Sequence, residues 1–207
     1  MVAGNPASWE QYRQAFAQAA DWYQKVVAQV EGRWTEPGLG EWDVRALAGH
    51  TSRSLLTVEA YLARPAAEVE VGSAADYYRA TRAISAGPEV AQRGRDAGQA
   101  LGEDPVAAVA AIAARVLPLV DAASGEELVT TIAGGMRLAD YLPTRILELV
   151  VHTTDLATAL GSPAEPPALP ATVVLRLVSD LAVADGRAGA LLLAATGRAV
   201  PSGFSVL

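Results

Sequence analysis

Hydrophobic residues recur at three- and four-residue steps in the first part of the chain, and this spacing predicts an amphipathic helix. The predicted helix occupies the segment from Pro6 to Gly32, because proline favours the first helical turn and glycine the position after the last. The next segment, from Trp34 to Glu41, is rich in glycine and proline and predicts a loop. The apolar positions of the helix are Trp9, Tyr12, Phe16, Ala19, Ala20, Tyr23, Val27 and Val30.

A second helix is predicted from Val44 to about Ala63, because Asp43 is a suitable N-cap and Pro65 cannot continue a helix. Further along, Ser73 and Asp76 form a weak capping signal, which predicts a short helix that reaches Ile84. The apolar face of the second helix consists of Leu47, Ala48, Leu55, Val58 and Leu62.

A third long helix is predicted from about 105 to 122. Pro118 lies inside this segment and is expected to kink the helix or to end it early. Residues 127–135 then predict a short extended stretch, in which the paired glycines Gly134 and Gly135 mark a turn. The residues of the helix that are expected to face inward are Val106, Val109, Ile112, Val116 and Val120.

The longest predicted helix runs from Arg137 to Leu160 and is closed by Gly161. After it the sequence predicts a proline-rich linker at 162–170, a helix at 171–185 and an apolar run at 190–195. Four long helices with short connectors and almost no strand signal predict an all-α four-helix bundle with a short C-terminal helical extension. We expect residues 5–161 to form the bundle and residues 162–207 to form a linker and extension that pack on it.

The chain is acidic, with a net charge of −7 and a pI near 4.8, which argues against a nucleic-acid partner. Lys25 is the only lysine, and the arginines are scattered, so no basic patch is expected. The 207 residues contain no cysteine. A disulfide framework and a thiolate supplied by the protein itself are therefore excluded.

No stretch reaches the ~18–20 uninterrupted apolar residues that a membrane span needs, so we expect no membrane partner. The richest stretch, 146–160, is interrupted by Glu148, His152 and Asp155. The first six residues contain neither a basic region nor an apolar run, and no signal peptide is expected. Together with the absence of cysteine, these features predict a cytoplasmic protein.

The chain holds two histidines, and their positions suggest chemistry. Glu148 precedes His152 by four residues, which places both side chains on one face of the predicted helix, about 5–6 Å apart at Cβ. Arg145 and Asp155 extend this polar stripe in both directions. Because the rest of the helix is apolar, the stripe is expected to face a partly enclosed space.

His50 lies on the second predicted helix and supplies a third ligand if the two helices are neighbours. Two imidazoles and one carboxylate suit zinc and leave a fourth coordination position open. Several plainer interpretations stay open. A Glu–His pair at this spacing also forms ordinary surface ion pairs, and a single histidine often packs or is solvated. Arg145 then pairs with a carboxylate, while Asp155 is solvated or accepts a hydrogen bond from a ligand histidine.

Three segments resemble one known family. The stretch from Trp42 to His50 is similar to its W-x-V-x-x-L-x-x-H pattern, and the stretch from Arg145 to Leu156 resembles its R-x-x-E-x-x-x-H-x-x-D-L pattern. The ending Leu191 to Arg198 also resembles the tail of this family, which is the mycothiol-dependent maleylpyruvate isomerase family of DinB-like four-helix bundles. The resemblance covers nearly the whole chain.

This resemblance implies that His50, Glu148 and His152 hold a divalent metal, with zinc expected. Around such a site we expect Arg145 and Asp155 to support the ligands or to contact substrate. Of these two roles for Arg145, orientation of Glu148 is the one we expect. The resemblance further implies mycothiol as the low-molecular-weight thiol cosubstrate. The activity that it implies is a thiol transferase or isomerase reaction on a small electrophilic substrate.

One feature departs from the family pattern. The isomerase carries a further carboxy-terminal domain that contributes to its active site, and the residues after Ser162 are too few for it. We therefore expect this chain to share the metal site of the family, whereas it need not share the maleylpyruvate activity. A metal-dependent hydrolase and a non-catalytic, metal-stabilised binding module remain alternatives. A homodimer, in which a second subunit builds the other side of the site, also remains open.

Overall fold

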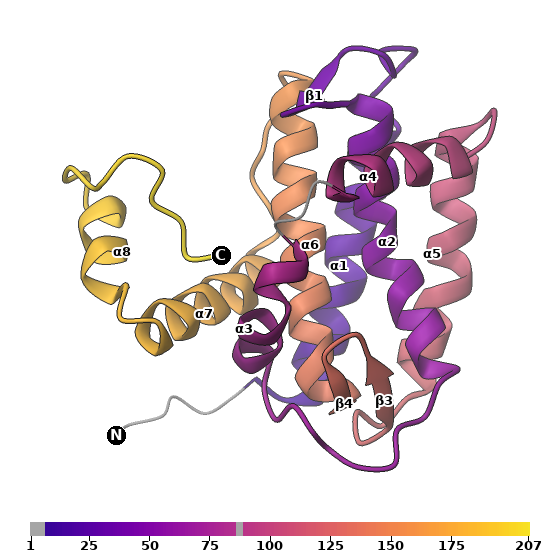
Figure 1. Ribbon diagram of the computed structural model, residues 1–207. Coiled ribbons are helices and arrows are strands. Elements are labelled where there is room, and N and C mark those ends of the chain that lie inside the picture. Colours follow the sequence, from indigo (N-terminus) through magenta and orange to yellow (C-terminus); the bar gives the residue numbers. More distant parts are fainter. Residues whose placement is uncertain (1–6, 86–88) are drawn as a thin grey trace.

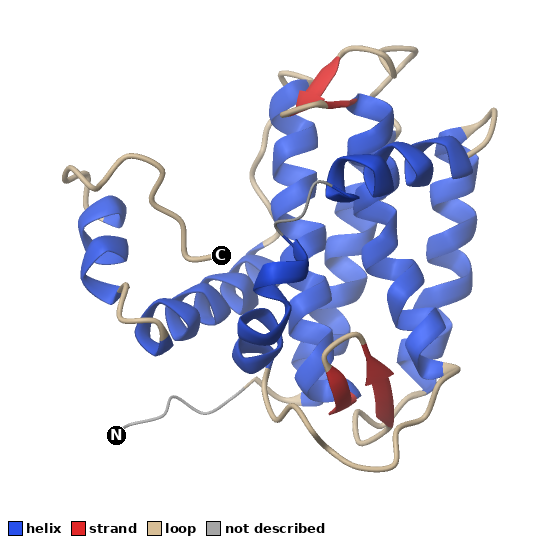
Figure 2. Cartoon of the chain, viewed as in Figure 1, coloured by secondary structure: helices blue, strands red, loops and turns tan. Residues whose placement is uncertain are grey.

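Four long helices form the body of the protein, two of which run in one direction and two in the opposite direction. The computed structural model describes residues 7–85 and 89–207 (Figures 1 and 2). Each bundle helix contacts two others, since α1 packs on α5 and α6, and α2 packs on the same two helices. The all-α prediction is confirmed, because the strands of the described residues form no more than two short hairpins. The bundle helices are α1 (Trp9–Val27), α2 (Val44–Leu62), α5 (Pro105–Ala122) and α6 (Leu138–Ala159).

The boundaries of α1 differ from the prediction. Ser8 caps this helix and forms a capping box with Gln11, because each side chain bonds to the backbone N–H of the other residue. The predicted start at Pro6 lies outside the described residues. The predicted end at Gly32 is wrong, because the helix stops at Val27 and the chain then turns through left-handed Glu31 and Gly32.

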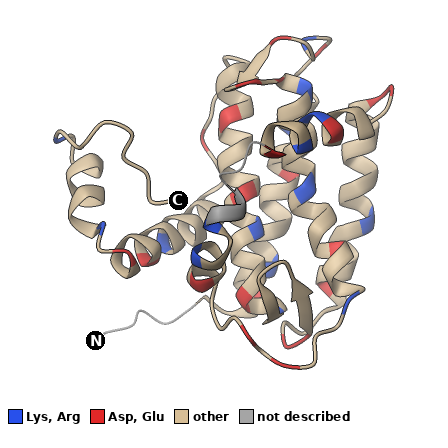
Figure 3. Ribbon diagram, in the orientation of Figure 1, with Lys and Arg blue, Asp and Glu red and all other residues tan. Residues whose placement is uncertain are grey.

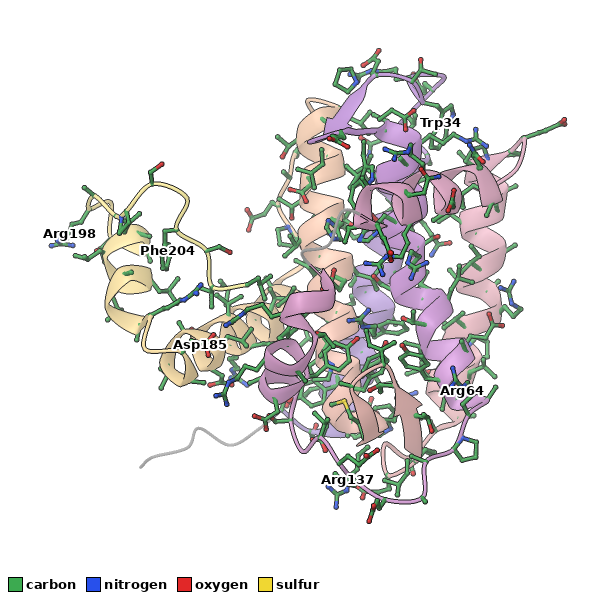
Figure 4. The ribbon with its side chains drawn as sticks, viewed as in Figure 1. Trp34, Arg64, Arg137, Asp185, Arg198 and Phe204 are labelled. Atoms are coloured by element: carbon green, nitrogen blue, oxygen red, sulfur yellow. The ribbon has the colours of Figure 1, made fainter. Side chains whose placement is uncertain are left out.

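The segment predicted as a loop before α2 contains a small antiparallel hairpin of β1 (Pro37–Leu39) and β2 (Trp42–Asp43). Strand β2 leads directly into α2, where the Asp43 carboxylate accepts a hydrogen bond from the Ala46 N–H at 2.7 Å. The second predicted helix and its cap are thus confirmed. The hairpin lies at one end of the bundle, near the labelled Trp34 in Figure 4, whereas the labelled Arg137 marks the opposite end.

Helix α5 has the predicted bounds. Pro118 does not end it early, because the helix continues to Ala122, and the alternative of a kink at Pro118 stays a prediction. Val106 does not face inward, since 39% of this side chain is exposed. By length and composition α5 is apolar enough to cross a membrane, but only 33% of it is buried in the structure and a core helix of a soluble protein passes the same test. This observation is therefore weak evidence for a membrane span.

The extended stretch before α6 is a hairpin of β3 (Leu128–Thr131) and β4 (Gly134–Arg137). The paired glycines were expected to form the turn of this hairpin, but they begin its second strand instead. Gly135 is required there for a close approach, because a Cβ atom at this position would lie 2.1 Å from the Glu68 carbonyl oxygen. The segment around Glu70 binds this strand, and the Gly135 N–H donates to the Glu70 carboxylate at 2.7 Å.

Helix α4 (Glu89–Ala100) was missed by the hydrophobic pattern, although its contact with α2 is extensive. The reason lies in its buried residues, which are Gly94 and Gly98 instead of large apolar side chains. These glycines lie four residues apart on one helix face and allow the backbones to approach closely. A Cβ atom at Gly98 would lie 2.8 Å from the Arg45 carbonyl oxygen of α2.

The C-terminal part begins earlier than predicted, because α7 (Ala168–Ala184) starts inside the expected linker. Helix α7 packs on α1, α3 (Ala74–Ser85) and α6, whereas α8 (Ala188–Ala195) contacts α7 and has no buried residue. Figure 1 shows α8 standing away from the bundle. Figure 3 shows no charged residue on α8. The division of the chain into units at residue 161 stays a prediction.

Candidate metal centre

Three side chains from two bundle helices converge at one place. His50 comes from α2, and Glu148 and His152 come from α6. One ligand atom of each residue lies within 4.8 Å of the other two. The two imidazole rings are nearly perpendicular, with an interplanar angle of 84°, and their centroids are 4.9 Å apart. The packing of α2 against α6 therefore unites residues that are about 100 positions apart in the sequence.

The position of His50 depends on the junction between β2 and α2. Asp43 caps the helix, and His50 follows seven residues later, about two turns into it. Trp42 packs against the imidazole of His50 with 4.4 Å between ring centroids. The indole N–H of Trp42 donates to the Ala91 carbonyl of α4 at 2.9 Å, which fixes the ring. The sequence alone did not reveal this contact between Trp42 and a candidate ligand.

The Glu148 carboxylate is held from both sides. One oxygen, Oε2, lies 3.2 Å from His152 Nε2, and the other, Oε1, accepts a hydrogen bond from the Tyr78 hydroxyl at 2.8 Å. Tyr78 belongs to α3, which packs on α6. Sequence analysis did not identify Tyr78, because the two residues are 70 positions apart and no spacing rule connects them.

His152 makes a second contact through its other ring nitrogen. Its Nδ1 lies 3.2 Å from Asp155 Oδ2, which is three residues further along α6. A carboxylate on the far nitrogen of an imidazole fixes the orientation of the ring and raises its basicity as a ligand. The geometry therefore agrees with the interpretation of Asp155 as an acceptor for His152.

Arg145 forms no direct ion pair with Glu148, although its charge lowers the pKa of this carboxylate. Within the described part of the chain no carboxylate lies close enough to this guanidinium for an ion pair, and its Nε donates to the Thr144 hydroxyl at 2.9 Å. The guanidinium carbon lies 5.5 Å from the ring centroid of Tyr77 and 5.0 Å from that of Tyr141. The direct hydrogen bond to Glu148 comes from Tyr78, and the expectation that Arg145 orients Glu148 stays a prediction.

The three candidate ligands differ in protonation. Burial alone raises the pKa of Glu148, but the hydrogen bond from His152 and the charge of Arg145 outweigh it and lower this pKa to about 2. Burial alone lowers the pKa of His152, but its hydrogen bonds to Asp155 and Glu148 raise it to about 9. Burial and the charge of His152 lower the pKa of His50 to about 4. At pH 7 the metal-free site thus has neutral His50, charged His152 and ionised Glu148.

A metal ion bound by His152 must displace its proton, because only a neutral imidazole is a ligand. The pKa of His152 is about 9 in the folded protein and lower in the unfolded chain. The proton on His152 therefore stabilises the metal-free fold fully at pH values below the unfolded-state pKa, and this stabilisation is lost as the pH rises through 9. We therefore expect release of about one proton per ion at pH 7.5, and less above pH 9. Titration calorimetry in two buffers of different ionisation enthalpy measures it. Zinc binding without proton release at pH 7.5 would contradict this protonation pattern.

The residues present fit a divalent ion. Two imidazoles and one carboxylate are a donor set that zinc favours, with a fourth position left for water or substrate. The Nδ1 atom of His50 is buried and has no hydrogen-bond partner among residues 7–85 and 89–207. Buried polar atoms normally have a partner, so this nitrogen indicates that His50 is incomplete without a bound group.

Comparison of the sequence with known families matches residues 12–157 to the mycothiol maleylpyruvate isomerase N-terminal domain. Searches of the curated proteins and of the solved structures gave no match. The matched segment covers more than half of the chain and contains His50, Glu148 and His152, whereas α7 and α8 lie outside it. The chain therefore belongs to the mycothiol maleylpyruvate isomerase N-terminal domain family.

Proposed function

We propose that this protein is a metal-dependent enzyme that joins a low-molecular-weight thiol, mycothiol, to a small electrophilic substrate. His50, Glu148 and His152 are the proposed ligands, and zinc is the ion that this donor set suits best. The observation that carries the proposal is the convergence of three ligand atoms within 4.8 Å, in a chain of a family whose description includes mycothiol.

The ion would supply one chemical function, which is to keep a coordinated thiol deprotonated at neutral pH. The thiol must come from outside, because the chain has no cysteine. In the reaction the thiolate sulfur would add to an activated carbon–carbon double bond, so that a carbon–sulfur bond forms as the π bond breaks. If the neighbouring carbon then takes up a proton, the adduct persists, which gives a transferase. If the adduct instead rotates about the new single bond and expels the thiolate, the double bond re-forms, which gives an isomerase. We place this chemistry in the cytoplasm, where thiols are kept reduced.

The chain's own residues orient the ligands. Tyr78 holds one oxygen of Glu148 so that the other oxygen lies beside His152. Asp155 orients the imidazole of His152, and Trp42 covers that of His50. Because these contacts come from α3, α6 and β2, the site is preorganised by the tertiary structure and does not depend on a mobile loop for its ligands.

Cobalt substitution tests the proposal. In protein loaded with cobalt in place of zinc, mycothiol is expected to produce a sulfur-to-metal charge-transfer band in the near-ultraviolet. Mycothiol should produce this band at a lower concentration than cysteamine, because the pocket walls and not the sulfur atom give selectivity. His152→Ala protein serves as the matched control and should show no band.

Two other outcomes would overturn the thiol chemistry. Cobalt protein that gives no band with thiols but hydrolyses activated esters, with a pH midpoint near neutrality, would establish a hydrolase that uses metal-bound water. Cobalt protein that does neither would establish a binding module whose ion stabilises the helical core.

A further inference from the structure

The outer face of α7 is apolar although no part of the bundle covers it. Leu175, Ser179 and Val183 follow one another at four-residue steps and therefore share one side of the helix. Leu175 and Val183 are 66% and 70% exposed, and among the described large apolar residues that Leu192 alone equals such exposure. The other side of α7 packs on α1, α3 and α6, so this outer stripe contributes nothing to the core of one chain.

Helix α8 adds apolar surface beyond the end of α7. It carries no charged residue and buries none of its residues, and Leu192 and Leu193 are 66% and 42% exposed. A helix that is apolar on all sides is normally covered by protein or by lipid. We call the exposed apolar residues Leu175, Val183, Leu192 and Leu193 the α7–α8 surface.

Two charges of opposite sign border the stripe on α7. Arg176 and Asp180 are exposed and lie one turn apart, each next in sequence to a residue of the stripe. Neither side chain forms an ion pair with a residue of the described segments 7–85 and 89–207. Along α7 the positive charge comes first, so the order is reversed in a second α7 that runs antiparallel to the first.

A second copy of this chain complements the pattern. In a two-fold pair of antiparallel α7 helices that cross beside Ser179, residues equally far before and after the crossing face each other. Arg176 of one copy then lies beside Asp180 of the partner subunit, and symmetry repeats the contact. Leu175 likewise packs against Val183 of the partner subunit. Ser179 is small, which lets the two helices approach closely at the crossing.

A lipid surface fits these residues less well. Anionic leaflets attract clustered basic residues, whereas this chain has a net charge of −7 and Asp180 borders the apolar stripe. A two-fold partner, in contrast, places a positive charge beside this carboxylate. The charge pattern therefore favours protein as the cover of the α7–α8 surface.

We propose that two copies of this chain associate through the α7–α8 surface, with their α7 helices antiparallel. The proposal goes beyond the proposed function, because this surface lies outside the matched segment 12–157 and contains none of the proposed ligands. The apolar stripe supplies the affinity. The ion pairs at its border determine which way the helices run, since exposed charge pairs contribute more to orientation than to affinity.

Sedimentation equilibrium of the full chain tests the association. The mass is expected to rise with concentration from 21.5 kDa to about 43 kDa, which is twice the mass of one chain. Leu175→Ser should raise the Kd of the dimer about tenfold, because both copies lose apolar contact area. This variant should remain folded by circular dichroism, because Leu175 is 66% exposed in one chain.

Charge reversal tests the antiparallel direction. Arg176→Glu and Asp180→Arg should each raise the dimer Kd about tenfold, because two attractive pairs become two repulsive ones. An equimolar mixture of the two variants should dimerise as tightly as the wild type, since every pair is again of opposite sign. Arg64→Glu is the matched control and should leave the Kd unchanged, because Figure 4 places Arg64 on the opposite side of the molecule from Asp185 at the end of α7.

Cross-linking tests the position of the crossing. The chain has no cysteine, so one introduced thiol reports one position. Ser179→Cys should form a disulfide-linked dimer under mild oxidation, because the two copies of this residue meet at the crossing. Thr172→Cys is the matched control on the same exposed side of α7. Its two copies would lie roughly 20 Å apart, at a rise of 1.5 Å per residue, and should not cross-link.

Three results would overturn the proposal. A mass of 21.5 kDa at every concentration would exclude the dimer. A dimer that neither Leu175→Ser nor the charge reversals weaken would use another surface. A monomer that binds phosphatidylglycerol vesicles, and loses this binding in Leu192→Ser, would show that lipid covers α8.

Discussion

Replacement of His152 or Glu148 by alanine is expected to remove the metal ion from this protein. Elemental analysis of protein purified without chelator should give about one divalent ion per chain for the wild type and almost none for either variant. The reason is geometric, because α6 supplies two of the three atoms that lie within 4.8 Å of one another. The two ligands that remain in either variant cannot offset the dehydration of the ion.

Two comparisons make this result specific. Glu59→Ala, on α2 like His50, removes a surface carboxylate that pairs with Arg115 and should leave the metal content unchanged. Tyr78→Phe removes the hydrogen bond to Glu148 and should weaken zinc binding roughly 10- to 100-fold, while the protein stays folded. Full occupancy in both His152→Ala and Glu148→Ala would show that any bound ion lies elsewhere.

Replacement of Gly49 by alanine is expected to destabilise the fold by about 3 kcal/mol, because the new methyl group has no space. A Cβ atom at this position would lie 2.2 Å from the Gly98 nitrogen and 2.3 Å from the Ala97 carbonyl carbon of α4. Backbone atoms cannot rotate away, so α4 must move off α2. Thermal unfolding followed by circular dichroism measures the loss as a lower Tm.

The same substitution should affect the candidate metal centre. Gly49 precedes His50, and α4 also holds Trp42 against the His50 ring through Ala91. Zinc affinity is therefore expected to fall together with stability. Gly189→Ala is the matched control, since Gly189 is helical and exposed, and its Cβ would meet nothing within 4 Å. Equal stability of Gly49→Ala and Gly189→Ala would contradict the close packing of α2 and α4.

Large apolar residues at helical spacing were sufficient to predict the four bundle helices. Phe16, Leu55, Val116 and Leu147 are all buried as this periodicity requires, because each lies on the stripe that the bundle must cover. Helix α4 escaped prediction for the opposite reason. Its buried positions are glycines, which contribute close approach instead of hydrophobic area, and periodicity reports only the latter.

The residues of the candidate site also divide into those that the spacing along one helix predicts and those that depend on the packing of two helices. The spacing of Glu148 and His152 on one helix determined that these side chains share a face, since helical geometry is local. The role of Asp155 beside His152 was also accessible, because it is a local contact of three residues. His50 required the further condition that α2 and α6 are neighbours, and the resemblance to a family suggested it before the structure showed the helices in contact.

By itself the sequence determined the four helices and the local pairings on α6, because these follow from the period of one helix. The tertiary structure alone decided that Tyr78 holds Glu148, that Trp42 covers His50, and that Arg145 faces the rings of two tyrosines. These contacts join segments that are distant in sequence, and their partners depend on how the helices pack. Packing is set by the shapes of all the side chains together, which no single spacing encodes.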